Sequence, residues 1–119
     1  MKSLHRTKTI AAYEGARMAI KAGMPYPSYM LLKEAARGVM SYIVEDSLDK
    51  EISEKTKLVR LLDLVKPGTM TDEQIACVQT LVNAENAGLV GIISMDMNEL
   101  TQVKRAIKKL IVDYFKEPI

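Results

Sequence analysis

Apolar residues recur at every third or fourth position in five segments of this chain, and this spacing places one apolar stripe along an α-helix. Little of the sequence between these segments resembles a β-strand. The pattern therefore predicts a single all-α domain over residues 1–119, folded as an antiparallel up-and-down bundle of four to five helices. In the last segment a helix is expected from about residue 96 to about residue 115. Its stripe comprises Leu100, Val103, Ile107, Leu110 and Tyr114.

The first two helices are expected over residues 3–22 and from about residue 29 to residue 47, with a stiff turn containing two prolines between them. Ser28 follows the second proline and is a candidate N-cap, because a serine hydroxyl accepts a hydrogen bond from a free N–H of the first turn. The second helix is apolar around more than half of its circumference, which predicts a central position. A close crossing with another helix would explain Gly38 inside it, although no structural reason is required for a glycine there.

A polar, acidic loop follows, then a short helix over residues 54–65, and a fourth helix is expected after Thr71. Thr71 and Gln74 have the spacing of a capping box, in which each side chain bonds to the backbone N–H of the other residue. Asp96 and Glu99 have the same spacing, so a second capping box is expected at the start of the last helix.

The segment before the last helix is apolar all round, whereas most connecting segments are polar. One interpretation is that it continues the fourth helix and is buried. The other is that it forms an exposed patch that a second subunit covers. In that case the interface would comprise Leu89, Val90, Ile92, Ile93 and Met95.

Charge is unevenly distributed along the chain, although the net charge is only +2. Residues 1–38 carry seven Lys or Arg and two acidic residues. Residues 39–100 carry five Lys or Arg and eleven acidic residues, and residues 101–119 carry five Lys or Arg and two acidic residues. The basic ends would form a basic face if the first and last helices are neighbours, or the opposite charges would pair around the bundle and cancel. Four cations of the last helix lie opposite its apolar stripe and are candidates for contacting the phosphates of RNA or a nucleotide. They are Lys104, Arg105, Lys108 and Lys109.

Arg37 follows Glu34 by three residues, so both lie on the same face of the second helix. The common interpretation of this spacing is a surface ion pair. If that face lines a groove, Arg37 could instead bind an anion.

The residue types argue against most enzyme chemistry. Cys77 is the single cysteine and His5 the single histidine, and they lie far apart in the sequence. We therefore expect no disulfide, metal site, cofactor or nucleophile–base pair, and no catalytic residue. The acids between residues 45 and 54 lack calcium-loop spacing and are expected to be solvated. A remaining enzymatic alternative is a carboxylate site that uses Glu34 or Glu85.

Two features predict a cytoplasmic location without membrane association. No apolar run follows the N-terminal residues, so no signal peptide is expected, and the single cysteine suits a reducing compartment. The most apolar stretch, residues 87–95, has about half the length of a membrane span.

The order of the elements resembles the HEPN domain of prokaryotes, a small helical bundle with a long antiparallel first pair, a short third helix and a long last helix. The resemblance rests on residues 11–23, 29–39 and 55–62 and on the helix that begins near Asp96. Many HEPN proteins are ribonucleases whose signature is an Arg followed four to six residues later by a His. His5 has no such Arg before it, so the resemblance implies no catalytic residue.

The resemblance implies a scaffold that forms homodimers, associates with minimal nucleotidyltransferases, or binds nucleotides or RNA. We therefore expect a non-enzymatic helical-bundle interaction domain, homodimeric and a partner of a nucleotidyltransferase-type protein. The alternative is RNA or nucleotide binding through the basic face of the first and last helices.

Overall fold

The computed structural model describes residues 2–116 and 118–119, and side chains from His5 onward. These residues form α-helices and no strand, which confirms the predicted all-α class. The described residues contain six helices instead of the predicted four to five, because the apolar segment before the last helix is a helix of its own. The helices are α1 (Lys2–Lys21), α2 (Pro25–Leu48), α3 (Leu58–Leu64), α4 (Asp72–Asn86), α5 (Gly88–Ile93) and α6 (Met97–Phe115).

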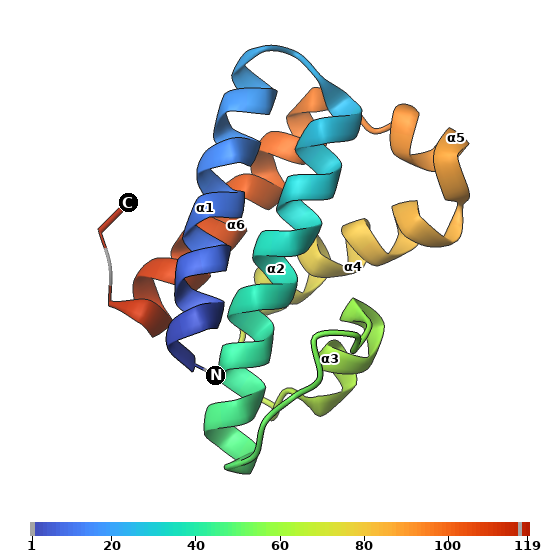
Figure 1. The fold of residues 1–119 in the computed structure, drawn as a ribbon. Coiled ribbons are helices and arrows are strands. Elements are labelled where there is room, and N and C mark those ends of the chain that lie inside the picture. Colours follow the sequence, from blue (N-terminus) through green and yellow to red (C-terminus); the bar gives the residue numbers. More distant parts are fainter. Residues whose placement is uncertain (1, 117) are drawn as a thin grey trace.

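Helix α2 is the centre of the arrangement, as its apolar circumference predicts. It runs antiparallel to α1, and α6 packs against both helices (Figure 1). Helix α4 crosses α2 and α6 in this view instead of running alongside them, so the bundle is not up-and-down throughout. Helix α2 contacts every other helix of the described chain, whereas α5 contacts only α2 and α4. The predicted apolar stripe of α6 is buried except for Tyr114, which is half-buried and donates a hydrogen bond to the Thr69 carbonyl.

Helix α2 begins four residues earlier than the sequence pattern suggests. Its N-cap is Met24, which makes no side-chain capping bond, and Pro25 opens the first turn. A proline is well suited to this position because its φ is preset and its missing N–H would be unpaired there anyway. The predicted Ser28 cap is therefore wrong. The Ser28 hydroxyl instead donates to the Met24 carbonyl from inside the helix, at 2.6 Å.

One of the two predicted capping boxes is present. At the start of α4, Thr71 Oγ1 accepts the Gln74 N–H and Gln74 Oε1 accepts the Thr71 N–H. At the start of α6, the Asp96 side chain accepts a hydrogen bond from the N–H of Asn98. It does not form the reciprocal pair of bonds with Glu99 that a capping box requires. Asp96 is therefore an N-cap, but the predicted partner is wrong.

The helices α1 and α2 approach each other closely at Gly38, so of the two explanations left open for this glycine the close crossing is the one found. A Cβ atom added to Gly38 would overlap Thr9 Oγ1 of α1. Thr9 is fully buried, and its hydroxyl has no hydrogen-bond partner in the described part of the chain. The threonine side chain thus fills the space that a side chain at residue 38 would need.

We predict that Gly38→Ala lowers the free energy of unfolding by about 1–3 kcal/mol, because overpacking outweighs the gain in helix propensity. Chemical denaturation measures this effect. Thr9→Ala alone removes an unpaired hydroxyl and a buried methyl, so its cost should be smaller than that of Gly38→Ala, and adding it to Gly38→Ala should restore part of the stability. A Gly38→Ala protein as stable as the wild type would contradict the close crossing.

Candidate functional site

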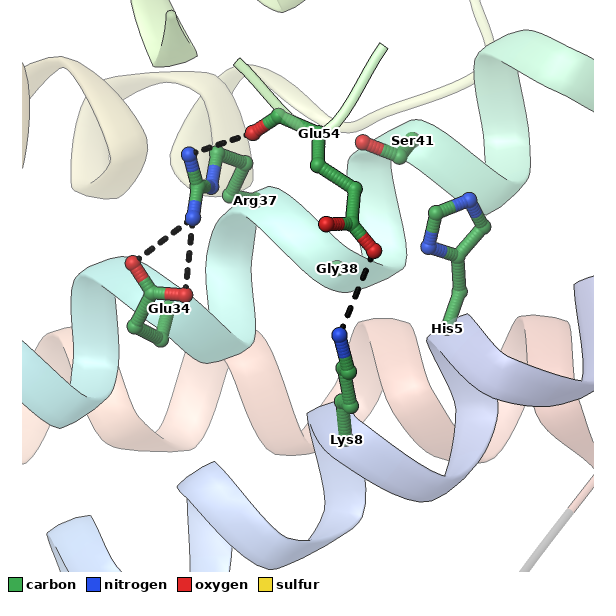
Figure 2. A pocket seen from close by; sticks show the side chains of 7 residues that line it. All are labelled: His5, Lys8, Glu34, Arg37, Gly38, Ser41 and Glu54. Atoms are coloured by element: carbon green, nitrogen blue, oxygen red, sulfur yellow. Dashed lines mark hydrogen bonds and ion pairs between the residues drawn. The ribbon is translucent and has the colours of Figure 1, made fainter. Parts of the chain in front are cut away.

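A small pocket opens between α1, α2 and the loop of residues 49–57, and we call it the α1–α2 pocket (Figure 2). Its volume is about 90 Å³. The lining side chains come from segments far apart in the sequence, and most of them are charged. They are His5 and Lys8 from α1, Glu34, Arg37, Gly38 and Ser41 from α2, and Glu54 from the loop.

His5, which lines the α1–α2 pocket, makes a buried hydrogen bond to Glu45 of α2. His5 Nε2 lies 2.9 Å from Glu45 Oε1, and the two residues are 8% and 3% exposed. The same oxygen accepts the backbone N–H of Ile52 at 2.8 Å. A carboxylate only accepts hydrogen bonds, so the proton of this contact lies on His5 Nε2. One carboxylate oxygen therefore joins α1, α2 and the loop.

The environment of Glu45 favours its ionised form. Burial opposes ionisation, but the hydrogen bond from the Ile52 N–H and the neighbouring His5 together outweigh it, so the pKa of Glu45 is lowered. The prediction that the acids of this region are solvated is thus wrong for Glu45. Its partner is 40 positions away in the sequence, and no local spacing reveals such a contact.

The outer part of the pocket is held by exposed ion pairs. Arg37 Nη2 contacts both carboxylate oxygens of Glu34 at 2.8 and 2.9 Å, which confirms the predicted surface pair. Arg37 Nη1 also donates to the Glu54 carbonyl at 2.8 Å, and Lys8 Nζ lies 3.2 Å from Glu54 Oε1. The lysine holds the pKa of the Glu54 carboxyl below its usual value. Both the backbone and the side chain of Glu54 therefore fix the loop over the pocket.

The four candidate phosphate-binding cations of α6 are not equivalent. Arg105, Lys108 and Lys109 are exposed, whereas Lys104 is half-buried. Lys109 lies 3.6 Å from Asp113, and Arg105 and Lys109 share a hollow with Glu73 at the start of α4. Helices α1 and α6 are in contact, as a shared basic face requires. However, Lys8 and Arg17 of α1 are paired with carboxylates.

The five apolar residues predicted as an interface are divided between exposed and buried positions. Leu89, Val90 and Ile93 are 60%, 76% and 57% exposed, whereas Ile92 is partly buried and Met95 is 8% exposed. We call the three exposed side chains the α5 face. The alternative that this segment is a buried continuation of α4 is wrong. Gly88 adopts a φ of +75°, a left-handed conformation that favours glycine, and the chain turns there into α5.

The remaining candidates for chemistry do not form a site. Glu34 is paired with Arg37, and Glu85 lies on the surface, where its Oε1 is 3.3 Å from Lys33 Nζ. Burial raises the pKa of the Cys77 thiol, which disfavours a reactive thiolate. Within residues 2–116, 118 and 119, no three or more His, Cys, Asp or Glu residues are grouped so that they could hold a metal ion.

No protein-family model matches this chain, and no curated protein or solved structure is significantly similar to it. The resemblance to HEPN domains therefore stays a prediction from the pattern of elements. None of the described helices has the length and apolarity that a membrane span needs.

We predict that Glu45→Gln lowers the free energy of unfolding at neutral pH by about 1–3 kcal/mol, because a buried charged acceptor is replaced by a weaker one. Since the pKa of Glu45 is lower in the folded state, its contribution is complete above the unfolded value of about 4.3 and is lost as the pH falls through the folded value. The difference between variant and wild type should therefore shrink on acidification.

Urea denaturation between pH 7 and pH 3 measures this difference directly. Asp63→Asn is the matched control, because Asp63 is exposed and the substitution also removes one negative charge. A stability difference that does not depend on pH would contradict the role assigned to the Glu45 carboxylate.

Proposed function

We propose that this chain is a non-enzymatic, HEPN-like interaction domain that docks a partner protein on the α5 face. The observation that carries this proposal is the exposure of Leu89, Val90 and Ile93 on one short helix. Large apolar side chains that are adjacent and exposed are typical of surfaces that a partner covers. Figure 1 shows α5 at the outer end of α4, away from α1.

The α5 face has a fixed orientation on the bundle. A Cβ added to Gly91 would lie 3.2 Å from the carbonyl oxygen of Ala84, so α5 lies close to the last turn of α4. Met95 is buried just beyond α5 and holds the segment that leads into α6. A rigid apolar face binds with little loss of conformational entropy, which supports a docking role over a flexible linker.

The charges around α5 favour a partner with basic residues. Asp96 and Glu99 are exposed at the start of α6. A hollow beside α5 is lined by small and polar residues and carries Glu99. A partner segment with apolar side chains flanked by Lys or Arg complements this surface. A two-fold dimer through α5 would bring the same acidic rim against itself, so a different protein fits better than a second copy. The HEPN resemblance supports a nucleotidyltransferase-type protein as this partner.

We predict that Leu89→Gln/Val90→Gln/Ile93→Gln abolishes retention of the partner while leaving the unfolding curve nearly unchanged, because all three side chains are exposed. Affinity capture from the cells that produce the protein measures retention, and sedimentation at rising concentration measures self-association. Met18→Gln/Val59→Gln is the control, because these side chains are exposed elsewhere on the bundle.

Three outcomes are distinguishable in this experiment. A stoichiometric partner that the control retains and the α5 variant loses is the expected result. Self-association lost only in the α5 variant would replace the partner by a second copy of the chain. Equal behaviour of both variants would contradict docking on the α5 face.

The second candidate function is RNA or nucleotide binding, and the exposure of Arg105, Lys108 and Lys109 on α6 favours it.

We predict for this candidate that changing these three residues and Lys104 to Gln abolishes binding of a single-stranded RNA. Salt titration of the wild type should give a slope of about −0.7 per phosphate contact, which the variant should lose. RNA binding that persists in the quadruple variant would exclude this face. RNA binding that persists in the α5 variant would separate the two functions.

A further inference from the structure

We propose that the α1–α2 pocket binds the phosphate group of a small phosphorylated molecule, and that the Glu54 carboxylate occupies this position in the free protein. This site lies apart from the α5 face and does not depend on docking there. Three features support this assignment: the hydrogen-bond donors of the pocket, the position of Glu54 and the size of the cavity.

The pocket gathers three side chains that can donate hydrogen bonds to an oxyanion: Lys8, Arg37 and Ser41. Ser41 is only 5% exposed and lines the pocket from α2. Lysine, arginine and serine together form a donor set that suits phosphate oxygens. A nearly buried serine beside two cations places a hydroxyl donor within the same pocket as the charged groups.

The Glu54 carboxylate behaves as an internal substitute for such a ligand. Figure 2 shows it lying over the pocket between Lys8 and Arg37, with Oε1 at 3.2 Å from Lys8 Nζ. Both side chains of this ion pair are well exposed, and exposed pairs of this kind contribute little to stability. A phosphate group carries more negative charge than a carboxylate and more acceptor oxygens. It can therefore displace the Glu54 side chain from Lys8.

Arg37 is already oriented for this exchange. Its two contacts with Glu34 hold the guanidinium plane, and its bond to the Glu54 carbonyl fixes the same group against the loop. Because the loop backbone is held separately from the Glu54 side chain, the carboxylate can swing out while the loop stays in place. Arg37 then contacts the incoming anion without having to reorganise.

The cavity fits an anion of limited size. A volume of about 90 Å³ accommodates one phosphate group, so the rest of a larger ligand would lie outside the mouth. A metal cation is disfavoured by the lysine and arginine that line the pocket. The part of the chain that the structure describes also holds no suitable cluster of metal ligands there.

The test is a titration of the full chain with inorganic phosphate, adenosine monophosphate and acetate, followed by NMR chemical shifts of the pocket amides. We expect Glu54→Gln to tighten phosphate binding by about threefold to tenfold, because the internal competitor is removed. Lys8→Gln and Ser41→Ala should each weaken it by about tenfold, because each removes a donor. Acetate should bind more weakly than either phosphate compound.

Two matched controls separate a specific site from general electrostatics. Lys66→Gln removes an exposed positive charge at the end of α3, and Asp63→Asn removes an exposed negative charge nearby. Neither should change phosphate affinity, and the α5 triple variant should not change it either.

Equal affinity for both phosphate compounds would identify inorganic phosphate as sufficient, whereas tighter binding of the monophosphate would identify a phosphomonoester ligand.

Two results would overturn the proposal. One is the absence of phosphate binding at millimolar concentration in both the wild type and Glu54→Gln. The other is an equal loss of affinity in Lys8→Gln and Lys66→Gln, which would show that only net charge matters. Unfolding curves of each variant ensure that a lost signal does not reflect a lost fold. Lys8 and Glu54 are exposed, so these two variants should fold.

Discussion

The close contact between α1 and α2 at Gly38 is the constraint on which the rest of the structure depends. The absence of a side chain there lets Thr9 enter the contact, so the two backbones lie near each other. The same crossing brings Lys8 of α1 beside Arg37 and Ser41 of α2. A wider separation would pull the donors of the pocket apart and would loosen the central helix against α6. The packing of two helices and the geometry of the pocket therefore have one cause.

The buried pair of His5 and Glu45 extends this contact to the loop. One oxygen of Glu45 accepts hydrogen bonds from an imidazole of α1 and from the Ile52 backbone, so the loop is anchored to both helices. This anchor and the bond from Arg37 to the Glu54 carbonyl together hold Glu54 over the pocket. A buried charge is costly unless it is paired and hydrogen-bonded, and both requirements are met here. The buried Glu45 carboxylate thus helps to position the loop.

Local rules predict much of this fold. The apolar stripe of α6, the capping box at Thr71 and the ion pair of Arg37 with Glu34 all follow from short-range spacing. A glycine inside a helix left the crossing at Gly38 open, and the structure decides it. The errors arise where two local signals compete or where the partner is distant.

Proline ends one helix but also begins another, so the sequence pattern predicts a start of α2 that is later than the observed start at Pro25. Gly88 can sit inside a helix or turn the chain, and only the tertiary structure decides between them. The contact of His5 with Glu45 joins residues too far apart in the sequence for any periodicity to reveal. The exposure of α5 likewise depends on which helices cover it.

The measurement that tests the central claim most directly is hydrogen–deuterium exchange, comparing the free chain with the assembly purified from the cells that produce it. If the α5 face is the docking surface, the exchange of backbone amides should slow over residues 88–95 and stay unchanged in α6. Protection confined to residues 102–112, with no change over residues 88–95, would contradict the account and would assign the interaction to the basic helix.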